Sequence, residues 1–125
     1  MVEVEVGGEP RLILGDDLDD LASAKPTDEV RLLPGFDQYV MGPGTDDGHI
    51  VPAARRAAVS KQSGWISPVV LGGGVVRGTW GLDGDVARIS WFREAGPAPS
   101  AALAAEAARL SSILGRPLEA VIQPV

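Results

Sequence analysis

The chain has 125 residues, 45% of them hydrophobic, which is enough for one folded domain with a real, though not a large, core. It has no cysteine, so disulfides, thiolate metal sites and cysteine nucleophiles are excluded. The net charge is −6, but residues 1–50 carry −9 (twelve acids, three bases) and residues 51–125 carry +3 (five acids, eight bases). An acidic chain binds DNA poorly, because such binding depends on neutralising phosphates, yet the second half leaves room for one weakly basic face.

No targeting or membrane segment is predicted. The N-terminus alternates apolar and acidic residues, whereas a signal peptide has a basic segment followed by an apolar run. No stretch approaches the roughly 18 apolar residues that a membrane span needs, so no membrane partner is expected. The lack of cysteine fits a reducing compartment, and we expect a cytoplasmic protein.

The first half of the chain predicts short elements. In chain order they are a strand at 2–6, a turn at 7–8, a strand at 11–14, a helix from Asp16 to about residue 24, a strand at 30–33, an extended or irregular segment at 36–41, a loop at 42–48 and a short helix at 50–60. The strict alternation at 2–6 is typical of a half-buried strand, and Asp16 is a residue type that caps helices. Pro52 suits the first turn of the last helix.

The second half predicts an antiparallel meander over 65–92. Its strands are expected at 65–71, 75–82 and 86–92, with turns at 72–74 and 83–84. A helix capped by Ser100 follows, with Leu103, Ala107, Leu110 and Leu114 on one face. Gly115 marks its end, and 118–125 predicts a last strand that returns to the sheet edge. The predicted fold is a single α+β domain over 1–125, a small antiparallel barrel-like sheet with two or three short helices.

Several motifs between residues 31 and 80 occur in a distinctive order. The segment Leu-Leu-Pro-Gly-Phe-Asp-Gln-Tyr at 32–39 is followed by two arginines at 55–56, a strand with Pro68, a glycine turn and the segment Val-Val-Arg-Gly-Thr-Trp at 75–80. This order resembles the family of bacterial winged helix DNA-binding domain-containing proteins. The signature residues that carry the resemblance are Phe36, Asp37, Tyr39, Pro68, Gly78 and Trp80.

The resemblance implies a DNA-linked context. Family members are longer and place several winged-helix modules before a C-terminal β-rich domain, which is the part that this chain resembles. Some relatives are DNA glycosylases that unhook alkylated or cross-linked bases with a Gln-x-Gln or Gln-x-Asp motif. Here Gln38, Gln62 and Gln123 are each followed two positions later by another residue type, so no catalytic residue and no cofactor is carried over.

Four basic residues are the candidate DNA contacts: Arg55, Arg56, Lys61 and Arg77. They could touch phosphates, or they could form a solvated face that balances the acidic first half, which is the interpretation we favour. For Asp37, a contact to DNA or to a neighbouring module competes with a role in shaping its own turn, and we favour the turn. The tryptophans are expected to pack on the sheet, with Trp65 the best candidate for stacking on a base.

Metal and nucleotide sites find little support. The only histidine, His49, follows two aspartates in a loop, but no further ligand completes a metal set. The glycines at 72–74 lack the lysine of a phosphate-binding loop and predict a hairpin turn.

We expect a non-catalytic accessory domain that braces DNA-reading modules. The partners would be double-stranded DNA, bound weakly through residues 55–77, and missing winged-helix modules. The alternatives are a protein-interaction module without nucleic acid and the C-terminal remnant of a DNA glycosylase.

Overall fold

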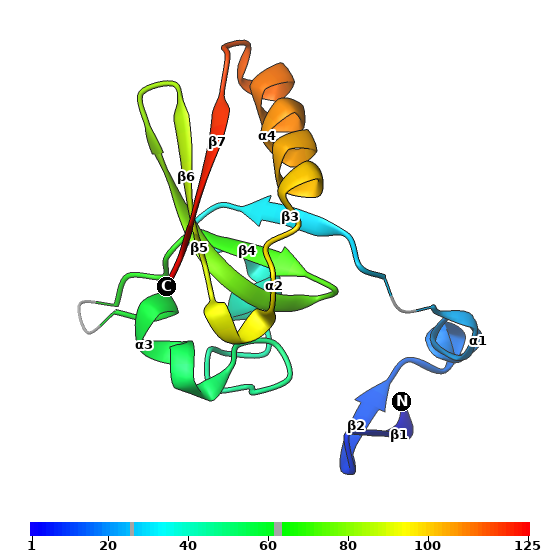
Figure 1. Cartoon of the computed structure of the whole chain (residues 1–125). Helices are drawn as coiled ribbons and strands as arrows, with labels where there is room; N and C mark the ends of the chain where they lie inside the picture. The colour runs from blue at the N-terminus through cyan, green and yellow to red at the C-terminus, as the bar shows by residue number, and fades with distance from the viewer. Residues whose placement is uncertain (26, 62–63) are drawn as a thin grey trace.

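The computed structural model describes residues 1–25, 27–61 and 64–125 (Figure 1). Its strands are β1 (Val2–Val6), β2 (Glu9–Ile13), β3 (Val30–Leu33), β4 (Val69–Gly72), β5 (Val75–Asp83), β6 (Val86–Trp91) and β7 (Glu119–Pro124). Its α-helices are α1 (Leu18–Ser23), α2 (Gln38–Met41), α3 (Arg56–Val59) and α4 (Ser100–Leu114). Short 3-10 turns occur at Gly15–Asp17, Ala53–Arg55 and Arg93–Ala95.

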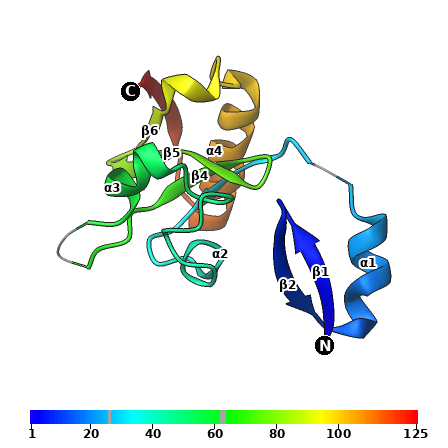
Figure 2. The same ribbon diagram turned by 90° about the horizontal axis from the view of Figure 1, so that it is seen from below.

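The N-terminal hairpin forms as predicted, and its turn is built from two glycines. β1 and β2 pair antiparallel, and Gly7 and Gly8 adopt positive φ angles of 56° and 82°. Positive φ at both central positions gives the turn that matches the twist of a hairpin. Figure 2 shows this hairpin and α1 lying beside the rest of the chain. No residue in 1–25 is buried, although Val4 and Ile13 are half-buried.

The predicted cap of the first helix is wrong. Asp16 lies inside a 3-10 turn, and α1 begins after Asp17, which makes no side-chain cap hydrogen bond. The backbone N–H of Asp17 already bonds the carbonyl of Leu14, so the chain enters the helix through this turn. The acidic side chains still lie at the N-terminal end of the helix, where its dipole favours negative charge.

The meander of β4, β5 and β6 is confirmed, with shifted ends. β4 begins at Val69, later than the predicted 65, because Ile66 makes only an isolated bridge to Ser60. Asp83 still pairs with Val86, so the second turn consists of residues 84–85, one residue later than predicted. Gly84 takes the positive φ of 60° at the first central position, as a two-residue hairpin loop requires.

The five-stranded sheet has the order β3-β4-β5-β6-β7. The first four strands are antiparallel to their neighbours, but β7 pairs parallel to β6 because α4 carries the chain back to the same end of the sheet. β3 and β7 are the two edges, so the described residues form an open sheet and the barrel-like description is loose. The α+β class is confirmed. The α-helices number four in these residues, against two or three predicted, and α2 is the one that was not predicted.

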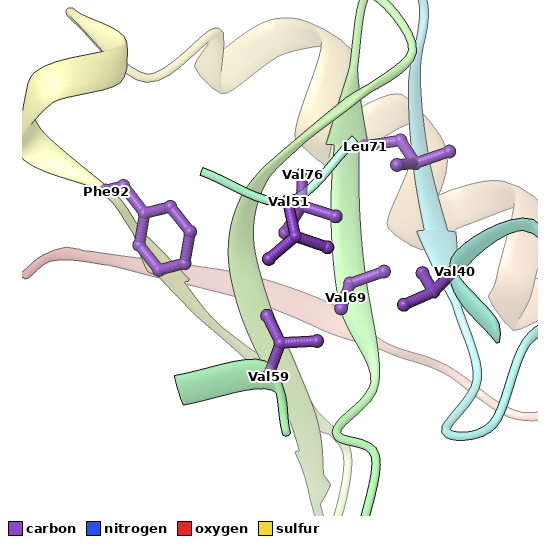
Figure 3. Packing of buried hydrophobic residues seen from close by; sticks show 7 residues of the cluster. All are labelled: Val40, Val51, Val59, Val69, Leu71, Val76 and Phe92. Carbon is purple, nitrogen blue, oxygen red and sulfur yellow. The ribbon is translucent and has the colours of Figure 1, made fainter. Parts of the chain in front are cut away.

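Both faces of the large sheet are covered. On one face, seven side chains converge, with Phe92 at one side and Val40 at the other (Figure 3). The remaining members are Val51, Val59, Val69, Leu71 and Val76. On the other face, α4 packs against β3 and β7 over a second cluster that contains Leu32, Val70, Ile89, Trp91 and Leu103. Val69 and Val70 contribute to opposite faces, as successive strand residues do.

Helix α4 has the predicted limits, but not all four residues predicted on its apolar face are covered by the sheet. Leu103 and Ala107 are buried and Leu110 is half-buried, but Leu114 is exposed. Ser100 was predicted as the cap, yet Pro99 occupies that position and makes no side-chain cap bond. Gly115 ends the helix in the left-handed conformation with φ 69°, as predicted.

The face of α4 also carries a buried carboxylate. Glu106 is only 4% exposed, and it bonds Arg109 (Nε to Oε1, 2.7 Å) and, more distantly, Arg31 (Nη1 to Oε2, 3.4 Å). A buried charge is tolerated when it is paired and hydrogen-bonded in this way.

Candidate nucleic-acid interface

The signature segment leaves the sheet through a capped turn. Asp37 is the N-cap of α2, and its carboxylate accepts a hydrogen bond from the backbone N–H of Tyr39 at 2.9 Å. Residues 38–41 are therefore helical, and the prediction of an extended or irregular segment at 36–41 is wrong there. The cap bond replaces a lost backbone partner at the helix start, which is why so short a helix forms. Asp37 has the turn-shaping role that we favoured.

Other signature residues tie this turn to the sheet. The Tyr39 hydroxyl donates to the carbonyl of Gly74 in the β4–β5 turn at 2.6 Å. The indole N–H of Trp80 donates to the carbonyl of Leu33 at 2.9 Å, and the Pro68 carbonyl accepts from the backbone N–H of Trp80 at 3.3 Å. Each of these bonds joins segments distant in the sequence, so the signature residues hold the loops and the sheet in one arrangement.

Gly78 has a role that depends on its missing side chain. A Cβ at this position would lie 2.3 Å from the carbonyl oxygen of Ser90 and 3.3 Å from the Cα of Trp91, both on β6. Real Cβ atoms essentially never come within 3.0 Å of such an atom. Close approach of two backbones is one of the conditions that glycine satisfies inside a strand.

Phe36 and Trp65 form an exposed aromatic pair. Their ring centroids are 5.2 Å apart at an interplanar angle of 87°, and the residues are 46% and 52% exposed. Phe36 has a positive φ of 58°. The left-handed conformation costs about 1–2 kcal/mol for a residue with a Cβ. An edge-to-face aromatic contact stabilises by about 0.5–1.5 kcal/mol. The energy of the edge-to-face contact between Phe36 and Trp65 is therefore about equal to the cost of the left-handed backbone at Phe36.

The guanidinium of Arg55 is engaged by other groups of the protein. Its Nε and Nη2 bond the two carboxylate oxygens of Glu94, both at 2.7 Å, and Nη2 also bonds the carbonyl of Val125 at 2.8 Å. The guanidinium carbon lies 4.7 Å from the centroid of the Phe92 ring. Hydrogen bonds from Arg55 lower the pKa of Glu94 to about 2, and the same bonds raise the pKa of Arg55. This arginine is bound to a carboxylate and is not free for phosphate.

The other three basic candidates lie in different settings. Arg56 is exposed, and its Nε bonds the Thr45 hydroxyl at 3.2 Å. Lys61 is exposed, and its backbone N–H bonds the carbonyl of Trp65 at 2.8 Å. Arg77 is half-buried in a groove that Glu94 also lines, and its Nε bonds the carbonyl of Gly72 at 3.3 Å. The structure thus pairs Arg55 with Glu94, leaves Arg77 half-buried, and leaves Arg56 and Lys61 exposed to solvent.

Spacing along the sequence could not reveal the partner of Arg55. Glu94 lies 39 residues away and belongs to no motif. The contact of Phe36 with Trp65 was missed for the same reason, although Trp65 had been singled out by its place at the start of a predicted strand.

The histidine loop forms a local pair. The Nδ1 atom of His49 lies 2.9 Å from Oδ1 of Asp47, which also accepts the backbone N–H of His49. The hydrogen bond from the His49 backbone lowers the pKa of Asp47 most, and the hydrogen bond from the His49 side chain lowers it further. Across residues 1–25, 27–61 and 64–125, no three histidine, cysteine or acidic side chains gather in a way that could hold a metal ion. In the same ranges no helix is long and apolar enough to span a membrane.

Comparison with known proteins identifies the family. The family model described as "DNA glycosylase AlkZ-like" matches residues 1–113. The chain belongs to the AlkZ-like DNA glycosylase family. An interstrand DNA cross-link repair glycosylase of Streptomyces sahachiroi is 37% identical over 115 residues, which cover 92% of this chain and 31% of that protein.

The solved structures give the same relationship. The DNA glycosylase AlkZ of Streptomyces sahachiroi matches with a TM-score of 0.93 and 36% identity, over 98% of this chain and 33% of that one. The chain therefore spans about a third of the length of these AlkZ-like relatives.

Proposed function

We propose that this chain serves an AlkZ-like DNA glycosylase as its bracing domain and that it performs no base excision itself. The observation that carries the proposal is the use of the signature residues. Asp37, Tyr39 and Trp80 direct their polar groups at the chain's own backbone, and Gly78 allows two strands to approach. Residues with such roles maintain a scaffold.

The exposed apolar side chains of residues 1–25 support the inference that another module packs against this part of the chain. Two strands and a short helix cannot bury much apolar area alone, and an isolated hairpin is marginally stable in water. Leu12, Leu14 and Leu21 are 67%, 56% and 46% exposed. We infer that other modules of a longer glycosylase, winged-helix modules in our proposal, cover these side chains. The alternative of a separate protein partner would use the same surface.

A direct contact to DNA is a second part of the proposal. Among the four basic candidates, Arg56 and Lys61 are exposed and can reach phosphates, while Arg55 bonds a carboxylate and Arg77 is half-buried. Two cations would add only weak, salt-sensitive binding, in keeping with a domain that assists others in holding the duplex.

A chimera tests the proposed function. The matching third of the Streptomyces sahachiroi glycosylase is replaced by this chain, and release of bases from a cross-linked DNA duplex is measured for the parent, the chimera and this chain alone. We expect the parent and the chimera to release bases and the chain alone to release none. Release by the chain alone would place catalysis within it. A folded but inactive chimera would contradict a bracing role in an enzyme of this kind.

A matched pair of variants shows whether bracing matters. Gly78→Ala in the chimera should lower base release, because it disturbs the packing of β5 on β6. Gly81→Ala on the same strand should leave it unchanged, because nothing lies within 4 Å of the added Cβ.

A further inference from the structure

The aromatic pair Phe36–Trp65 brings together two segments that are far apart in the sequence. Phe36 belongs to the turn after β3, and Trp65 belongs to the segment before β4. A Cβ at Gly35 would lie 2.8 Å from the carbonyl oxygen of Ile66, so the turn is pressed against the backbone next to Trp65. The fold thus places both rings at one point of the surface and keeps each about half exposed.

The backbone of Phe36 argues for a role outside the chain. Among the described residues it is the one non-glycine residue with a positive φ. Glycine would adopt this conformation without strain, and the contact with Trp65 only about offsets the strain that phenylalanine meets. Strained residues of this kind cluster at ligand-binding sites. The exposed half of the Phe36 ring, held at a strained position beside Trp65, is therefore available for a contact with another molecule.

The charge around the pair suits a nucleic acid. The backbone N–H of Lys61 bonds the Trp65 carbonyl at 2.8 Å, so a basic residue with an exposed side chain belongs to the same turn as the indole. The sequence of segments 34–41 and 58–68 contains one acid, Asp37, and its carboxylate bonds the backbone of its own helix. Aromatic rings with neighbouring cations bind unpaired nucleotides, because bases stack on the rings and the cations attract the phosphates.

We propose that Phe36 and Trp65 form a stacking site for a DNA base that has left the double helix, with Lys61 beside the phosphate. Because the two rings are perpendicular, they present differently oriented surfaces, and a flat base can stack on an exposed ring face. Stacking of this kind tolerates any base, so the site takes unpaired DNA without reading its sequence. The inference rests on the proposed role in a DNA glycosylase, whose substrates contain disturbed base pairs.

The test compares two oligonucleotides of equal charge. Fluorescence anisotropy measures binding of a labelled 12-nucleotide oligothymidylate and of a 12-unit abasic oligomer that has the same phosphates but no bases. The wild-type chain should prefer the oligothymidylate by roughly tenfold, the contribution of about one stacked base. Trp65→Ala should abolish the preference, and Trp65→Phe should restore most of it because a flat ring is present again.

Two further variants separate binding from folding. Phe36→Gly should weaken the preference while the urea midpoint stays close to that of the wild type, since the strain is lost together with the ring. Ile113→Ala removes a side chain that is also exposed, 64%, but lies on α4, and it should change neither quantity.

Two outcomes of the binding assay would overturn the proposal: equal binding of both oligomers by the wild type, or a folded Trp65→Ala variant that keeps the preference. The result is separate from base release. If the chimera releases bases but the chain shows no preference for oligothymidylate, only the stacking site is refuted. If the chimera is inactive but the chain shows the preference, only the proposed function is refuted.

Discussion

Replacement of Gly78 by alanine should destabilise the protein, although the same change elsewhere on β5 should not. The new Cβ would lie 2.3 Å from the Ser90 carbonyl oxygen, which belongs to the backbone of β6 and cannot rotate away as a side chain would. β5 and β6 are central strands with clusters on both faces, so neither can move without disturbing the core. Overpacking of this kind costs about 1–3 kcal/mol or more.

Gly81 provides the matched control. It lies three residues further along β5, it has no positive φ, and no atom lies within 4 Å of an added Cβ. Alanine there should be neutral or stabilise the protein by about 0.4–1 kcal/mol, because it restricts the unfolded chain. The two variants therefore differ by roughly 1–4 kcal/mol in the free energy of unfolding.

Urea denaturation followed by tryptophan fluorescence measures this difference. With an m-value of about 1–3 kcal/mol per molar urea, a loss of 2 kcal/mol lowers the midpoint by about 1 M. Thermal melting gives an independent value, at roughly 4 °C per kcal/mol for a chain of this size. Equal free energies of unfolding for Gly78→Ala and Gly81→Ala, within about 0.5 kcal/mol, would refute the reasoning, because the close approach of β5 to β6 would then carry no energetic weight.

Three further predictions concern single contacts. Because Arg55 holds the pKa of Glu94 at about 2, the pair stabilises the fold above the ordinary carboxyl value of 4.5 and loses that contribution as pH falls from there through about 2. Arg55→Met should return the Glu94 titration, followed by NMR, towards 4.5, and an unchanged titration would contradict the assigned cause. Tyr39→Phe removes one hydrogen bond and should lower the free energy of unfolding in urea by about 0.5–1.5 kcal/mol, and no loss would show that the bond is not formed in solution. The double variant Arg56→Glu, Lys61→Glu should weaken binding of a labelled duplex and reduce the salt slope by about 2, whereas unchanged binding would remove both residues from the DNA contact.

The sequence by itself determined the local elements. The alternation at 2–6, the glycines at 7–8 and 72–74, and the apolar spacing of residues 100–114 each predict an element that the structure contains, although Gly72 is the last residue of β4. Such signals succeed because they depend on backbone conformation and on the period of one strand or helix. Two of the local predictions that failed concerned helix starts. At Asp16 the backbone bond of a 3-10 turn takes the place of a cap, and Asp37 starts a helix that propensity alone would not favour.

The resemblance to a DNA-linked family was also present in the sequence. The order of the signature residues indicated a DNA-linked family, and the family model that matches is one of DNA glycosylases. What each signature residue does was not predictable from that order. Tyr39 and Trp80 were recognised as signature residues, but the carbonyls that they bond lie 35 and 47 residues away.

Only the tertiary structure decided the arrangement of the surface. It made β7 parallel because α4 crosses the sheet, it directed Arg55 to Glu94, and it brought Phe36 onto Trp65. In the same way Glu106, on the apolar face of α4, became a buried partner for Arg31 on β3, 75 residues away. Each of these results joins residues that chain distance separates. Such contacts depend on how several elements pack together, which no periodicity within one element records.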